Sequence, residues 1–287
     1  MGPIRPMGPI LFPRPSVNGI EYFEGTQRFS IEELSMRFPA LAVLALGLAA
    51  MAARQSFAQA TTQWDYEGKR GALAWHRLDP AYKICSAGHQ QAPIDIRGAR
   101  LNKALKPIEF HYISGPVTME NDGHTIVAHV DHGSYIVAGG VRYDLIYFDF
   151  HHPSEETVKN KLTDMSIHLV HQSADGKLAI IAVRLKEDMG NPNAVLATLW
   201  PHLPKAAGAS DKVADEVNPA GLLPADRGYW TYMGSLTTPP CTEGVRWFLF
   251  EQEISMSRDQ LRTFAPLFKV NTRPLQDAHG RRIEANE

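Results

Sequence analysis

The chain has 287 residues, a formal net charge of −2, 44% hydrophobic residues and 21% charged residues. These values are ordinary for a soluble globular protein of one large domain or two small ones. The near-neutral charge gives no basis for binding nucleic acid or an anionic membrane surface. The unusual count is 12 histidines, none before His76, which directs attention to metal or proton chemistry.

The first sixty residues carry export signals rather than a folded domain. Residues 1–35 are rich in Pro and Gly without a sustained period, and we expect them to be a non-native upstream extension. Residues 36–60 combine Arg37, an apolar run over 38–53 and a small-residue motif at 58–60, which is typical of a signal peptide cleaved after Ala60. An uncleaved anchor is the alternative, although the run is short for a membrane span. Cleavage leaves a single domain, residues 61–287, in the periplasm or secreted.

Export also affects the interpretation of the cysteines. Cys85 and Cys241 are the only two, and both lie in the predicted mature region. In an oxidising compartment we expect them to pair, and two buried free thiols are the alternative.

Most periodic segments of the mature region are predicted strands. Residues 124–130 and 134–139 flank a DHG turn and predict a hairpin. Residues 141–152 alternate, so that one face carries Ile146, Phe148 and Phe150, and the other carries Tyr147, Asp149 and His151. Residues 166–171 form a further strand, while 177–185 and 245–250 are apolar enough to be covered on both faces.

Helices are few. One is predicted over 194–202, and a second begins at Ser257, where SRDQ is a capping box, and ends near Phe264. Residues 206–228 are expected to form a surface loop that crosses toward the site. The pattern therefore predicts a β-dominated α+β domain with short peripheral helices.

Strand geometry gathers the polar residues. Asp149 and His151 are two apart and point to one side, and His168 from another strand could face the same cavity. Two imidazoles and a carboxylate can bind Zn²⁺ and leave one position open for water, but they also suit a two-histidine, one-carboxylate iron site. His152 points the opposite way and would need a bulge to become a ligand.

Longer motifs carry a resemblance to a known family. The segments WDYEG, QQAPIDI, NDGHTI, FDFHHPSEET, IHLVH and YWTYMGSLTTPPCTEGVRWF occur in this order, with a Trp at 75. The chain resembles the α-class carbonic anhydrases of the exported bacterial branch over nearly all of residues 64–283. The resemblance implies a large twisted, mostly antiparallel central sheet. It also implies zinc-dependent, reversible hydration of carbon dioxide to bicarbonate and a proton, with metal-bound hydroxide as the nucleophile.

The resemblance assigns roles to individual residues. The three zinc histidines of the family fall at Asp149, His151 and His168. Thr237 and Glu155 match the pair that orients the nucleophile, and His124 matches the proton shuttle. The carbon dioxide pocket corresponds to Val170, Ile180, Leu236, Thr238, Val245 and Trp247. Cys85 and Cys241 match the disulfide of exported members.

Four positions near the expected metal depart from the family pattern. Asp149 replaces a histidine, and its charge should raise the pKa of water at the metal. Ser166 replaces a glutamate that accepts the ring N–H of the third histidine, so the total charge near the metal is expected to be unchanged. Tyr147 replaces a glutamine, and its hydroxyl is expected to bond Asp149. Glu156 stands where a histidine is common and is expected to support the ligands.

These departures leave alternatives open. The expected function is zinc-dependent carbon dioxide hydration, slowed by Asp149, on a small-molecule substrate by a monomer or homodimer. An inactive carbonic anhydrase-related binding protein is the alternative, as is an esterase or an enzyme that uses Fe²⁺ or Co²⁺.

Overall fold

The computed structural model describes residues 63–188 and 191–286. The predicted upstream extension and signal peptide lie outside these residues and stay predictions. In the described part of the chain, no helix is long and apolar enough to cross a membrane.

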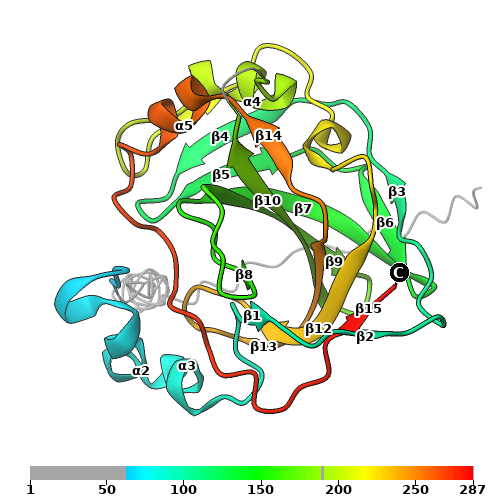
Figure 1. Ribbon diagram of the computed structural model, residues 1–287. Coiled ribbons are helices and arrows are strands. Elements are labelled where there is room, and N and C mark those ends of the chain that lie inside the picture. The colour runs from blue at the N-terminus through cyan, green and yellow to red at the C-terminus, as the bar shows by residue number, and fades with distance from the viewer. Residues whose placement is uncertain (1–62, 189–190, 287) are drawn as a thin grey trace, which may run out of the picture. The chain divides into compact units, whose positions relative to one another are not determined.

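Strands dominate the described residues, and short helices lie around them (Figure 1). The strands are β1 (Asp95–Ile96), β2 (Arg100–Leu101), β3 (Glu109–His111), β4 (Val117–Asn121), β5 (Ile126–Val130), β6 (Tyr135–Ala138), β7 (Val141–His151), β8 (Thr157–Val158), β9 (Met165–Ser173), β10 (Leu178–Glu187), β11 (Ser210–Lys212), β12 (Tyr229–Ser235), β13 (Glu243–Phe250), β14 (Ile254–Met256) and β15 (Glu284–Ala285). The α-helices are α2 (Trp75–Leu78), α3 (Ile84–Ala87), α4 (Ala194–Leu199) and α5 (Arg258–Phe264), and the 3₁₀ turns are η1 (Gly68–Arg70), η2 (Ala72–Ala74), η3 (Pro80–Tyr82), η4 (Trp200–His202) and η5 (Pro219–Leu222).

One large sheet passes through the centre of this unit. Its strands follow the order β11-β4-β5-β7-β9-β10-β13-β12-β15-β2. Outside this order, β14 pairs with β10, and β6 pairs with both β7 and β3. Most pairings are antiparallel, although β10 pairs parallel with β13 and β14, and β15 pairs parallel with β2. The prediction of a β-dominated α+β domain with a large, mostly antiparallel sheet is confirmed.

The central strands are buried on both faces, as their apolar sequences predict. On β10, Ile181 and Val183 join the larger core, whereas Ile180 and Ala182 join a second core on the opposite face. Period-two alternation thus divides a continuous apolar run between two layers. The second core borders the candidate site.

The predicted hairpin of residues 124–139 is wrong. β5 and β6 do not pair with each other, but lie end to end along the same edge of β7, where Val127 faces Asp149 and Tyr135 faces Asp144. The true hairpin joins β6 to β7 through Gly139 and Gly140, both with positive φ. Two successive residues with positive φ suit a tight two-residue turn, which glycine adopts without strain.

A bulge also corrects the predicted faces of β7. The register against β9 shifts between Leu145 and Tyr147. Ile146 is therefore 40% exposed, whereas Leu145, Phe148 and Phe150 share the larger core. A bulge inserts one extra residue and reverses the alternation on one side of it, which period counting alone cannot locate.

Two further predictions concern the peripheral segments. Helix α4 with η4 and helix α5 form as expected, and the capping box of Ser257 and Gln260 is present on α5. The segment 206–228 is more than a surface loop, because it supplies β11 and η5 and buries Val213 and Leu222 in the larger core.

A disulfide links α3 to the segment after β12. Cys85 and Cys241 are bonded, with Cα atoms 5.1 Å apart, and pack with buried Trp75. The Cys241 amide donates to the Thr238 carbonyl at 2.8 Å and closes the turn that follows Thr237, so the disulfide attaches this turn to α3. The predicted pairing is confirmed.

Candidate metal centre

The register of β7 and β9 brings the three predicted ligands together. Asp149 lies directly opposite His168, and His151 lies two residues further along the same face of β7. Asp149 Oδ1 is 3.5 Å from His151 Nε2 and 4.0 Å from His168 Nδ1. All three ligand atoms lie within 4.8 Å of one another.

Partners behind each imidazole set its orientation. His151 Nδ1 lies 2.9 Å from the Asn271 carbonyl, and His168 Nε2 lies 2.8 Å from Glu156 Oε1. A carbonyl and a carboxylate only accept, so both of these nitrogens donate. The opposite ring nitrogens are therefore left with lone pairs that point toward Asp149.

The converging atoms fit a metal ion. Asp149 Oδ1 and His151 Nε2 are buried and have no hydrogen-bond partner among residues 63–188 and 191–286. Buried polar atoms are almost always paired, so lone pairs that converge at one point suit the coordination of a cation. Two imidazole nitrogens and one carboxylate oxygen are ligands that Zn²⁺ accepts in sites with an open coordination position.

Buried charge surrounds these ligands. The Glu155 side chain is fully buried, and its Oε2 lies 3.8 Å from both His151 Nε2 and His168 Nδ1. Burial alone lowers the pKa of His151, but the Glu155 and Asp149 carboxylates outweigh it and raise that pKa to about 10. Burial raises the pKa of Glu155, although both histidines oppose this. The negative charge around His151 therefore favours a cation at its Nε2, either a proton or a metal ion.

Thr237 and Glu155 lie together beside the ligands. Thr237 is 6% exposed, and its hydroxyl interacts with the Glu155 carboxylate and lowers the pKa of that group. Glu155 Oε1 accepts the Arg273 backbone N–H at 2.7 Å. The carboxylate is thus held between the loop after β12 and the C-terminal segment.

His124 lies in the turn before β5, beside the first described residues. Its ring stacks on Trp64 with centroids 3.7 Å apart, and Nε2 donates to the Trp64 carbonyl at 2.9 Å. This contact leaves Nδ1 available as an acceptor. The ring is half-buried and so remains within reach of water.

The predicted apolar pocket forms one wall. Val170, Ile180, Val245 and Trp247 belong to the second core, and Leu236 packs against it. The Trp247 ring meets the His168 ring edge to face at 4.9 Å. This arrangement places an apolar surface directly against a candidate ligand. Thr238 is half-buried on the neighbouring turn.

The four departures from the family pattern have different outcomes. The expected bond from Tyr147 to the Asp149 carboxylate is not made to Oδ1, which has no hydrogen-bond partner in the described part of the chain. Ser166 does not contact a ring nitrogen, but accepts the Glu155 N–H at 3.2 Å. Glu156 contacts His168. Asp149, Glu155 and Glu156 thus place three carboxylates around the histidines. The exchange of charge between positions 149 and 166 therefore does not account for all the negative charge at the site. Although burial opposes it, His168 lowers the pKa of Glu156.

His152 is turned away from the centre. Its Nδ1 donates to the Asp164 carbonyl at 2.8 Å, and the bulge of β7 lies at 145–147 rather than beside it. The expectation that strand alternation excludes it as a ligand agrees with this geometry.

Three residues of the site were not predicted. Asn271 and Arg273 come from the irregular C-terminal segment and contact His151 and Glu155. Tyr66 has a buried hydroxyl without a partner, and its pKa is raised far above the usual value by burial and by the charges of Glu155 and Asp149. In the sequence, Tyr66 belongs to the WDYEG segment that carries the family resemblance.

Comparison with known proteins agrees with the geometry. Residues 70–287 match the model of the eukaryotic-type carbonic anhydrase family. The chain belongs to this carbonic anhydrase family. A carbonic anhydrase of Klebsiella pneumoniae is 39% identical over 223 residues, which cover 77% of this chain and 89% of that protein.

Solved structures show the same carbonic anhydrase fold. A hyperthermostable carbonic anhydrase from an active hydrothermal vent chimney has a TM-score of 0.75 at 39% identity, covering 78% of this chain and all of that one. The α-carbonic anhydrase of Thermovibrio ammonificans, solved with the inhibitor sulfanilamide, has a TM-score of 0.75 at 36% identity, covering 78% and 99%. This carbonic anhydrase is therefore an enzyme of a metal-dependent family that hydrates carbon dioxide.

Proposed function

We propose that the enzyme hydrates carbon dioxide reversibly with a zinc ion held by Asp149 Oδ1, His151 Nε2 and His168 Nδ1. The observation that carries the proposal is the convergence of these three ligand atoms within 4.8 Å, two of them buried and unpaired. When bound, the ion lowers the pKa of a water molecule so that a nucleophile is available near neutral pH. A carboxylate ligand adds negative charge, so this activation is weaker than with three histidines.

Thr237 and Glu155 orient the nucleophile. Glu155 is buried, held by the Arg273 N–H and adjacent to Thr237. When the Thr237 hydroxyl donates to the carboxylate, its oxygen can only accept from the attacking oxygen. That restriction directs a lone pair of the nucleophile toward the substrate carbon, and Thr238 bounds the space beside it.

The apolar wall receives carbon dioxide. Val170, Ile180, Leu236, Val245 and Trp247 offer no hydrogen bonds apart from the Trp247 indole, which is already donated to the Ser235 carbonyl at 3.0 Å. Such a surface favours an apolar gas over water. Tyr147 packs against this core, and burial, together with the nearby charge of Asp149, raises the pKa of the phenol. We assign Tyr147 the role of limiting water beside Asp149.

His124 exports the proton. Histidine titrates near neutral pH and can accept a proton on one nitrogen while the other stays bonded. Stacking on Trp64 holds the ring at a half-buried position from which it can exchange protons with buffer.

The predicted cellular location follows from the disulfide and the leader. Disulfides persist in oxidising compartments, and Cys85 is bonded to Cys241. We propose that residues 61–287 act in the periplasm or outside the cell after removal of residues 36–60, as a monomer or homodimer.

Stopped-flow hydration of carbon dioxide tests the function. Residues 61–287 are compared after zinc loading and after removal of metal by a chelator. A zinc-dependent rate well above buffer supports the proposal. A folded, zinc-loaded protein with the rate of the stripped sample would favour the binding-protein alternative, and ester hydrolysis or activity with Fe²⁺ or Co²⁺ alone would favour the others.

A further inference from the structure

Two consecutive glutamates lie on opposite sides of one imidazole. Glu155 Oε2 is 3.8 Å from His168 Nδ1, and Glu156 Oε1 is 2.8 Å from His168 Nε2. Both carboxylates are 0% exposed and the histidine side chain is 3% exposed. The two contacts differ in kind, because only Glu156 is at hydrogen-bonding distance. His168 therefore carries its proton on Nε2 and presents Nδ1 to Asp149 and His151.

The backbone around these glutamates is fixed from both sides. The Glu155 N–H donates to Ser166 Oγ at 3.2 Å, and the Ser154 hydroxyl donates to the Glu156 carbonyl at 3.1 Å. The Ser154 N–H in turn donates to the Thr163 carbonyl at 3.1 Å. These bonds fix the backbone from which the Glu156 side chain extends toward Nε2 of His168.

Ser166 cannot perform the same task. It precedes His168 by two residues on β9 and so lies on the same face of the strand. Its hydroxyl is short and is already engaged by the Glu155 N–H. A longer carboxylate at this position would lie on the side of the strand that carries the ring.

We propose that Glu156 is the positioning residue of His168, fixing the tautomer and ring orientation that turn Nδ1 toward Asp149 and His151. The carboxylate that orients this ligand thus comes from the loop after β7 rather than from β9. Groups that accept from a metal-bound histidine typically change metal affinity 10–100-fold when removed. The inference rests on the proposed metal site, but its effect on the tautomer exists without metal.

Nitrogen-15 NMR of the histidine rings in metal-free protein is the first test. In the wild type we expect His168 as the Nε2–H tautomer, with Nδ1 unprotonated. Glu156→Ala should abolish that preference and raise the Kd for Zn²⁺ about 10–100-fold in chelator competition. The double variant Glu156→Ala with Ser166→Glu should restore both readouts, because it returns an acceptor to the same side of the ring.

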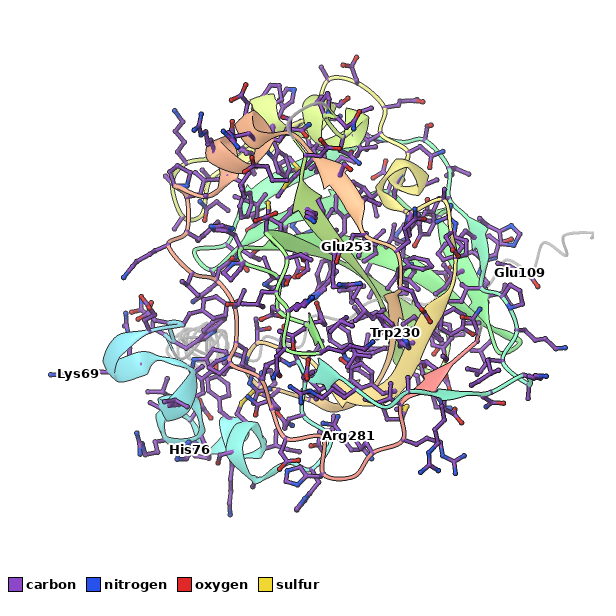
Figure 2. The ribbon with its side chains drawn as sticks, viewed as in Figure 1. Lys69, His76, Glu109, Trp230, Glu253 and Arg281 are labelled. Atoms are coloured by element: carbon purple, nitrogen blue, oxygen red, sulfur yellow. A yellow bond between two sulfur atoms is a disulfide. The ribbon has the colours of Figure 1, made fainter. Side chains whose placement is uncertain are left out.

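A matched control separates positioning from loss of charge. Glu253, labelled in Figure 2, carries a carboxylate that pairs with Arg184 at 2.8 Å, and Arg184 faces Ser166 across β10 and β9. Glu253→Gln should leave the His168 tautomer and the zinc affinity unchanged. If Glu156→Ala does not fold, Glu156→Gln keeps the volume and should shift the Kd in the same direction by a smaller factor.

The outcomes are distinct. An unchanged tautomer and Kd in a folded Glu156 variant would overturn the inference, as would a loss that Ser166→Glu does not restore. Failure of the wild type to bind zinc would instead overturn the proposed function, and the tautomer in metal-free protein would still decide the role of Glu156.

Discussion

Replacing Asp149 by histidine should accelerate the enzyme at pH 7. Asp149 Oδ1 lies 3.5–4.0 Å from the two histidine ligand atoms. At about 4 Å and an effective dielectric constant of about 20, one unit charge is worth about 4 kcal/mol, or about three pKa units. The charge is shared between two oxygens and the side chain is 14% exposed, so we expect the pKa of the activated water to fall by at least about one unit. The rate at pH 7 should then rise about tenfold or more.

Stopped-flow hydration from pH 6 to pH 10 measures this change. Each sample needs its zinc content determined, because the variant also changes metal affinity. Asp149→Asn is the control, since it removes the charge without supplying an imidazole and should lose zinc. Equal rates and equal pH midpoints for the wild type and Asp149→His, each with one zinc per chain, would refute the reasoning.

Two further variants and one pH series test other parts of the structure. Replacing Cys85 and Cys241 by serine removes a cross-link between residues 156 positions apart. In the loop-entropy model, the free energy of unfolding measured in urea should fall by about 5 kcal/mol. An unchanged free energy of unfolding would contradict that account. His124→Ala should reduce kcat about 100-fold in dilute buffer with little change in KM. Imidazole buffer should restore kcat. A reduced kcat that imidazole does not restore would exclude His124 as the proton-transfer group. Because the pKa of His151 is raised to about 10 in the metal-free protein, zinc must displace a proton, so the Kd should fall about tenfold per pH unit between pH 7 and pH 9. Calorimetry in buffers of different ionisation enthalpy should show release of about one proton at pH 7, and zero release would contradict the raised pKa.

The same raised pKa affects the stability of the metal-free protein. The pKa of His151 is about 10 when folded and near 6.5 when unfolded, so its stabilising contribution is complete below pH 6.5 and disappears as pH rises toward 10. Urea unfolding of stripped protein at pH 6.5 and pH 9.5 measures the change. His151→Gln should show a weaker dependence on pH over this range, and an equal dependence would argue against this assignment.

The sequence predicts those parts of the site that depend on strand period. Asp149 and His151 share a face because they are two residues apart beyond the bulge, and the register with β9 places His168 opposite Asp149. Ile146 was misplaced because a bulge leaves no signal in an apolar pattern. The hairpin failed for a related reason, since a turn signal shows that the chain bends but not which strand it then joins.

Contacts from irregular segments were beyond prediction. Asn271 and Arg273 lie outside any helix or strand, so no periodicity indicates where their groups point. Glu156 could be located near the ligands, but its choice of His168 depends on bonds around Ser154 that only the folded loop defines. Residues that orient a ligand are therefore harder to find than the ligand itself.

The group that orients His151 lies near the C-terminal end of the chain, which matters for the order of synthesis. Asp149, His151 and His168 all emerge from the ribosome about a hundred residues before Asn271, whose carbonyl fixes the His151 ring. Further along the same segment, Arg281, labelled in Figure 2, donates to the carbonyls of Met233 and Gln91. A chain that ends before this segment thus carries all three candidate ligands but lacks the carbonyl that orients His151. The orientation of His151 by this carbonyl therefore depends on residues near the C-terminal end of the described chain.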